Sequence, residues 1–177
     1  MWRGQTRALK PLAMNHTGQR VVVGEFGETP LEALENHLVV EEQPPPDLAL
    51  LGPKDAVVQV KSAAVGWVDL LMMSGQYQHM AKPPYCPGLE YAGVVIWTGP
   101  EVDGERLAVG DRVIADGFLT GPRSLGPYQQ YGGFASYAVA PAKALLPLPD
   151  TFSFDQGSNL LGNYETAYHC LIARGKL

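Results

Sequence analysis

The stretch PGLEYAGVV, at residues 87–95, gives the clearest indication of how this chain folds. Its last residues form an apolar, β-branched run of the kind that favours a strand. Gly88 and Gly93 are expected at places where a Cβ would obstruct a neighbouring backbone, or where the backbone takes a positive φ. Because the Pro-rich segment KPPYCPG at residues 82–88 comes first, the sequence predicts a turn that leads into a closely packed strand.

Outside this stretch the chain has the pattern of a protein built from many short strands. Its 20 glycines and 15 prolines make up about a fifth of the 177 residues, which suits a turn-rich β protein. The segment WVDLLMM at residues 67–73 predicts a short helix. Short strands separated by Gly- and Pro-containing turns indicate a small barrel or sandwich. The predicted strands cover residues 19–26, 38–41, 55–65, 90–97, 113–116 and 134–141.

The end of the chain is different in kind. The segment from Ser153 to Gln156 has the S-x-x-Q form of a capping box, which predicts the start of a helix. Apolar residues then recur at helical spacing as far as Gly175, so a helical connection is expected at residues 153–177. The sequence contains no G-x-G, so no dinucleotide-binding turn is predicted within it.

Composition and charge argue against several classes of protein. With 46% hydrophobic and 18% charged residues, the chain can bury a core and is not expected to be disordered. A net charge of -5 argues against nucleic acid as a partner, and no apolar run is long enough to span a bilayer. The two cysteines, Cys86 and Cys170, are far apart and imply neither a disulfide framework nor a zinc knuckle.

The beginning of the chain is basic, with no acidic residue before Glu25. Residues 1–18 are therefore predicted to form a flexible basic tail ahead of the folded domain. This tail lacks the Ser and Arg density of a good transit peptide. We expect a cytoplasmic protein, with organelle import through the basic N-terminus as the alternative.

Five blocks of the sequence follow one another in a specific order and spacing: KSAAVGWVD at 61–69, SGQY at 74–77, PGLEYAGVV at 87–95, VGDRV at 109–113 and GGFASY at 132–137. In combination they resemble the GroES-like catalytic domain of medium-chain dehydrogenases/reductases. The resemblance is greatest to the zinc-free quinone oxidoreductases and related enoyl reductases.

The resemblance implies a mainly β fold with short helices, in which residues 19–152 form a GroES-like, partly open β-barrel on the substrate side of the enzyme. It also implies that the helix at residues 153–177 would lead into a Rossmann nucleotide-binding domain, which this sequence does not contain.

The resemblance also bears on zinc. The zinc-dependent alcohol dehydrogenase branch of this family places a Cys just before the short helix and a His just before the Glu of the strand. This chain has Gly66 and Leu89 at those places, and neither side chain can bind a metal. The four histidines form no i, i+3 or i, i+4 pair. We therefore expect no metal site.

The resemblance suggests one residue at the substrate cleft and several near a nicotinamide cofactor. Tyr77 matches a Tyr whose phenol could polarise a carbonyl or deliver a proton. A purely structural role is the alternative for three of the residues named in this paragraph. Asp69 could be a carboxylate that caps the helix, Thr166 a helix hydroxyl satisfied by the backbone, and Tyr77 a packed ring. The positions that match cofactor contacts are Gly66, Trp67, Asp69 and Thr166.

Two further tyrosines, Tyr128 and Tyr131, lie in the Gly/Pro/Tyr-containing loop at residues 117–133. They could line a substrate pocket for a flat ring. The loop could equally be surface decoration.

The function implied by the resemblance is reduction of a quinone or an activated C=C bond by hydride transfer from NADPH or NADH, without zinc. The hydride chemistry belongs to the cofactor, and the protein orients it and the substrate. The expected partners are a small quinone or enone and, in the full-length protein, further copies in a homo-oligomer. The alternative is a non-enzymatic GroES-like module for binding or assembly, or an inactive fragment.

Overall fold

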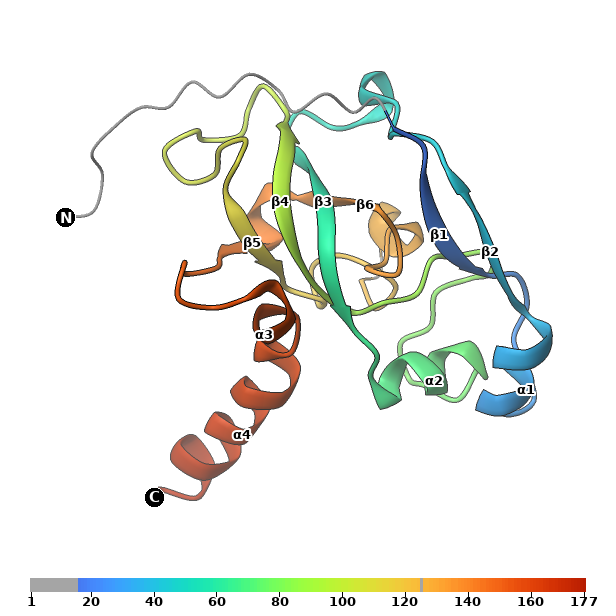
Figure 1. The fold of residues 1–177 in the computed structure, drawn as a ribbon. Helices are drawn as coiled ribbons and strands as arrows, with labels where there is room; N and C mark the ends of the chain where they lie inside the picture. Colours follow the sequence, from blue (N-terminus) through green and yellow to red (C-terminus); the bar gives the residue numbers. More distant parts are fainter. Residues whose placement is uncertain (1–15, 125) are drawn as a thin grey trace.

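A computed structural model describes residues 16–124 and 126–177 of the protein (Figure 1). Its strands form two antiparallel sheets, one of two strands and one of five in the order β6-β3-β4-β5-β7. The expected mainly β fold with short helices is confirmed. The strands are β1 (Gly18–Val23), β2 (Leu38–Gln43), β3 (Asp55–Ala64), β4 (Glu90–Thr98), β5 (Arg112–Ala115), β6 (Tyr137–Pro141) and β7 (Leu145–Pro147).

Short helices flank the sheets. The helix predicted at residues 67–73 is present as α2 (Trp67–Met73), directly after β3. The helix α1 (Pro30–Asn36) and the strand β7 were not predicted. Three-residue and four-residue 3₁₀ turns occur at Leu48–Leu50, Pro127–Gln130 and Ala142–Ala144.

The C-terminal helical region begins at the predicted capping box. The Ser153 hydroxyl accepts a hydrogen bond from the Gln156 N–H at 3.1 Å, and the Ser153 N–H donates to Gln156 Oε1 at 2.9 Å. This pairing satisfies two of the N–H groups that a helix start leaves free. The region consists of α3 (Phe154–Ser158), α4 (Thr166–Tyr168) and wider π-type turns at Leu160–Glu165 and His169–Arg174.

Most of the basic tail predicted at residues 1–18 lies outside the described residues, since the description starts at His16. Within the described part, Gly18 already belongs to β1.

Side chains alternate across the large sheet and build separate clusters on its two faces. On β3, Ala56 and Val58 belong to the main core, whereas Val57 faces the other side. On that outer face, the loop at residues 127–131 covers one end of the sheet and α3 covers the other. Figure 1 shows that α2 and the C-terminal helical region lie at the same end of the sheet.

The two glycines of the PGLEYAGVV stretch occupy positions that exclude a side chain, as predicted. Gly88 has φ +102°, and a Cβ there would lie 2.5 Å from the Phe134 amide nitrogen. A Cβ at Gly93 would overlap the carbonyl oxygen of Gln59 on β3. The turn before β4 and the β3–β4 pairing therefore both require close backbone approach.

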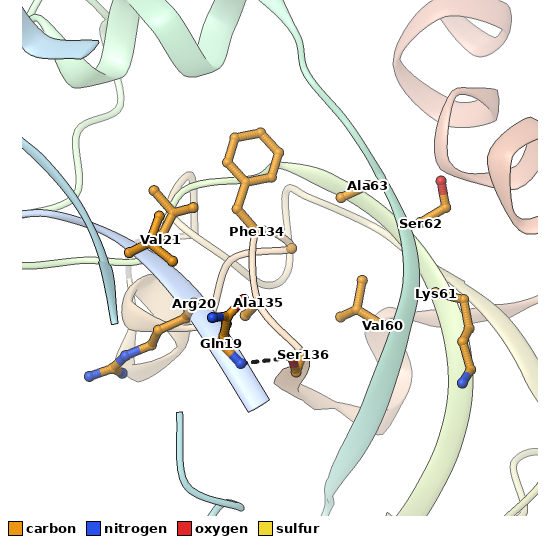
Figure 2. Close-up of a pocket in the computed structure, with 12 residues that line it drawn as sticks. Gln19, Arg20, Val21, Val60, Lys61, Ser62, Ala63, Phe134, Ala135 and Ser136 are labelled. Carbon is orange, nitrogen blue, oxygen red and sulfur yellow. Dashed lines mark hydrogen bonds between the residues drawn. The ribbon is translucent and has the colours of Figure 1, made fainter. Parts of the chain in front are cut away.

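The barrel is incompletely closed. β1 is joined to the segment before β6 by hydrogen bonds from the Val21 N–H to the Phe134 carbonyl and from the Ser136 N–H to the Gln19 carbonyl, each 2.8 Å. Beyond these bonds a groove of about 360 Å³ opens between β1 and the end of β3. In Figure 2, Val60 and Ala63 point to the Phe134 side of β3, while Lys61 and Ser62 point away from it.

Candidate functional site

The carboxylate of Asp69 joins the start of α2 to the turn before β4. Asp69 Oδ2 accepts the Gly66 N–H at 3.0 Å, and its Oδ1 accepts the N–H groups of Gly88 and Leu89, both at 3.1 Å. The side chain is buried, with the residue 3% exposed. We call Gly66, Asp69, Gly88 and Leu89 the Asp69 junction.

Burial sets the electrostatics of this junction. Desolvation raises the pKa of the Asp69 carboxyl, while the three N–H donors and the charge of Arg123 oppose that rise. All three donors come from the protein backbone, so the carboxylate is engaged within the chain. This geometry supports the capping interpretation of Asp69.

The junction also places Gly66 and Leu89 together, because both donate to the same carboxylate. These are the positions where the zinc-dependent branch has metal ligands, and here they offer a backbone and an apolar side chain. In the described parts of the chain, no three His, Cys, Asp or Glu side chains gather as a metal site.

Glu90, the residue after the junction, contacts the C-terminal helical region. A Cβ at Gly162 would overlap the Glu90 carboxylate, so the two segments pack closely at this point. Burial raises the pKa of Glu90, and the Gly162 backbone and the charge of Arg123 oppose the rise. The Ser62 and Ser158 hydroxyls, 3.2 Å apart, fix the same region to β3.

Arg123 supplies a cation close to Asp69 and Glu90. Its guanidinium carbon lies 3.7 Å from the centre of the Phe118 ring, and its Nε is buried without a hydrogen-bond partner among the described residues. Its charge acts on both Asp69 and Glu90. Arg123 was not predicted from the sequence. Its position in the Gly- and Pro-containing loop was visible, but its carboxylate neighbours lie far away in the sequence.

The residues predicted to contact the cofactor occupy two elements. Trp67, at the start of α2, is 68% exposed, and Gly66 precedes it. Thr166 is exposed on the C-terminal helical region, about one turn after the Gly162 contact. We call Glu90, Arg123 and Thr166 the open wall.

Tyr77 lies beyond the opposite end of α2. The seven-residue helix, which begins after Gly66, is about 10 Å long. The ring is half-buried and meets the His79 ring edge-on, with the centroids 6.3 Å apart. Tyr77 therefore follows the end of α2, whereas the Asp69 junction lies at its start.

Tyr128 and Tyr131 lie elsewhere, against the cluster on the outer face of the sheet that contains Val57. The Tyr128 hydroxyl donates to the Asp55 carboxylate at the start of β3. Burial and this carboxylate raise the pKa of Tyr128 to about 12. Tyr128 also lines a separate pocket, whose lining does not include Tyr131.

No helix within the described residues has the length and apolar character needed to cross a membrane.

Comparison with known proteins gives a consistent assignment. Residues 52–150 match the alcohol dehydrogenase GroES-like domain. The quinone oxidoreductase of Lama guanicoe is 31% identical over 160 residues, which are 88% of this chain and 42% of that protein. The quinone oxidoreductase-like protein 2 homolog of Nematostella vectensis is 36% identical over 118 residues, 67% of this chain and 29% of that protein. The chain thus spans less than half the length of these relatives.

Solved structures agree with this assignment. A probable oxidoreductase from Mycobacterium abscessus superposes with a TM-score of 0.69 at 28% identity, covering 92% of this chain and 45% of that one. A putative NADPH:quinone reductase from Mesorhizobium loti gives 0.71 at 27% identity, covering 90% and 44%. The chain therefore belongs to the medium-chain dehydrogenase/reductase superfamily, of the quinone oxidoreductase type, and carries its alcohol dehydrogenase GroES-like domain.

Proposed function

We propose that this chain is the substrate-side part of an NAD(P)H-dependent oxidoreductase that reduces quinones or activated C=C bonds without zinc. The observation that carries the proposal is the Asp69 junction. It brings Gly66 and Leu89 together on one carboxylate, next to a cation, and leaves no metal-binding side chain at either position. Similarity to quinone oxidoreductases supplies the class of reaction.

The exposed residues near the junction fit one face of a nicotinamide cofactor. Val65 and Trp67 offer exposed apolar surface, and Thr166 offers an exposed hydroxyl. A flat ring with a carboxamide needs these two kinds of contact. NADPH or NADH would supply the hydride when bound. The remainder of its binding site would belong to a nucleotide-binding half.

We propose distinct roles for the residues of this chain. Asp69 is a positioning residue, which holds the start of α2 against the turn before β4. Arg123 stabilises the negative charge that develops on the substrate oxygen during reduction, because its guanidinium carries a positive charge and forms no ion pair within the described residues. Tyr77 orients the substrate carbonyl or supplies a proton to it.

The test uses the full-length natural protein with NADPH and a set of simple quinones and enones. We expect reduction that a zinc chelator leaves unchanged, and purified protein that contains no stoichiometric zinc. Arg123→Gln should lower kcat/KM by about tenfold or more, because it removes a charged donor at the reacting oxygen. Tyr77→Phe tests the hydroxyl alone and should lower the rate with at least some accepted substrates.

One bound zinc per chain would contradict the zinc-free mechanism. No turnover by the full-length protein with any quinone or enone would favour the alternative, a binding or assembly module. A cytoplasmic location and a homo-oligomeric state belong to the same proposal, and cell fractionation and light scattering measure them.

A further inference from the structure

A second, larger pocket lies away from the proposed active site. It encloses about 730 Å³, a volume typical of small-molecule sites. It is formed by the turn before β5, the loop after β5 and the end of β6. None of Gly66, Asp69, Tyr77 and Thr166 lines it.

The lining of this pocket is largely apolar and partly aromatic. Val102, the Tyr128 ring and Pro141 contribute to it. Phe118 and Leu119, also in the lining, are 67% and 40% exposed. Exposed large apolar side chains gathered around a cavity are typical of ligand-binding surfaces. Phe118 and the Tyr128 ring could both pack on a flat molecule.

The walls of the pocket are fixed by hydrogen bonds within the protein. Arg106 donates to the carbonyl oxygens of Ala142 at 3.0 Å and Lys143 at 3.1 Å, which joins the turn before β5 to the end of β6. Tyr128 donates to the Asp55 carboxylate. These bonds hold the ring of Tyr128 and the backbone beside Lys143 in place, so the pocket is formed before any ligand binds.

Charge at the rim defines the polar part of the ligand. Three cationic and two acidic residues line the pocket, whereas the whole chain carries a net charge of -5. Lys54 Nζ lies 3.8 Å from Glu101 Oε2, and the Asp103 carboxylate accepts the Glu105 N–H at 2.9 Å. Among the described residues Lys143 forms no ion pair, so it remains available to an anion.

We propose that this pocket binds a small aromatic carboxylate, with the ring against Phe118, Leu119 and Tyr128 and the carboxylate at Lys143. This assignment goes beyond the proposed reductase function, since it needs neither a nicotinamide cofactor nor the Asp69 junction. The site is distinct from the open wall, although Phe118 contacts both the pocket and Arg123.

The test compares 2-naphthoate with its neutral analogue 2-naphthamide, titrated into the full chain in the absence of NADPH. Backbone amide NMR shifts of the ¹⁵N-labelled protein give both the affinity and the location. We expect 2-naphthoate to bind about fivefold more tightly than the amide, and Lys143→Gln to remove that difference. Shifts should be largest at Val102, Leu119 and Lys143.

Leu119→Asp places a like charge at the mouth and should abolish binding of 2-naphthoate. Lys61→Gln, on β3, and Leu171→Asp, on the exposed C-terminal helical region, are controls that should bind normally. Equal affinity for acid and amide, unchanged binding by Leu119→Asp, or no binding at millimolar concentration would each overturn the proposal. Binding that Tyr77→Phe weakens would also overturn it, by locating the ligand in the active site.

Discussion

The Asp69 junction and the open wall adjoin each other, yet they use polar groups in opposite ways. In the junction, one buried carboxylate accepts three backbone N–H groups. In the open wall, the Arg123 Nε has no partner among the described residues, and Thr166 is exposed. The first arrangement stabilises the fold, whereas the second leaves the Thr166 hydroxyl open to a ligand.

The two carboxylates show this difference directly. Burial raises the pKa of both Asp69 and Glu90. For Asp69, the cost of burying the charge is offset by backbone donors, which cannot move away without unfolding the turn. For Glu90, that cost is offset by one backbone group, at Gly162, and by the charge of Arg123. We infer that the junction, whose carboxylate is held by three backbone N–H groups, supports the open wall beside it, because functional groups are positioned by hydrogen-bonded neighbours.

Asp69→Ala should cause the largest loss of stability. The change leaves the buried N–H groups of Gly88 and Leu89, and the part-buried N–H of Gly66, without their acceptor. Since each orphaned buried donor costs about 1–3 kcal/mol, the free energy of unfolding should fall by about 4 kcal/mol. Urea denaturation followed by circular dichroism measures this change.

Asp111→Ala is the matched control. Its carboxylate accepts a single N–H, from Ala108 at 2.8 Å, at an exposed turn, so a loss of about 1 kcal/mol is expected. Similar losses for the two variants would show that the junction holds the fold no more firmly than an ordinary turn.

Gly88→Ala should have the next largest effect. At φ +102° a side chain is strained, and its Cβ would stand 2.5 Å from the Phe134 amide nitrogen. Strain and overlap together should lower the free energy of unfolding by about 3 kcal/mol. Gly104→Ala, where nothing lies within 4 Å of the added Cβ, should change it by less than about 0.5 kcal/mol. A tolerated Gly88→Ala would mean that the turn can move away from Phe134.

These features differ in how far the sequence could predict them. The capping box at Ser153 depends on neighbours three residues apart, and it was predicted. The side-chain exclusion at Gly88 and Gly93 was predicted because glycine within or beside a strand is itself a local signal, although the excluding atoms belong to the distant residues Phe134 and Gln59. The helix α1 has a Thr29 cap, but only Ala33 in it is buried. It therefore lacks the apolar stripe that marks a helix in sequence.

The open wall was predicted only in part, for a related reason. Thr166 was proposed from the resemblance, but Arg123 acquires its environment from residues distant in the chain. The Tyr128 hydroxyl likewise bonds to a carboxylate 73 residues earlier, which no local pattern indicates. Pairings of this kind arise from tertiary packing, so sequence periodicity does not encode them.

Ser153→Ala tests whether the helix that carries Thr166 is held as firmly as the junction. The change removes the acceptor of the Gln156 N–H, so a loss of about 1 kcal/mol in the free energy of unfolding is expected. Ser153→Asp keeps an accepting oxygen and should retain most of the stability. Amide hydrogen exchange after Ser153 should rise in the Ala variant alone. Equal exchange in both variants would show that the capping box does not hold the helical region that carries Thr166.

Glu90→Gln should give the smallest effect, visible mainly as a change in pH dependence. Because burial raises the pKa of Glu90 above its usual 4.5, the folded state favours the protonated side chain. That stabilising contribution is complete below the unfolded pKa and is lost as the pH rises through the folded one. The wild-type protein should therefore lose stability relative to Glu90→Gln between pH 4 and neutrality, with exposed Glu101→Gln as the control.

Since the Arg123 charge opposes the rise in the pKa of Glu90, the loss should grow in an Arg123→Gln background. A loss that Arg123→Gln leaves unchanged would separate Arg123 from Glu90 and divide the open wall into independent parts.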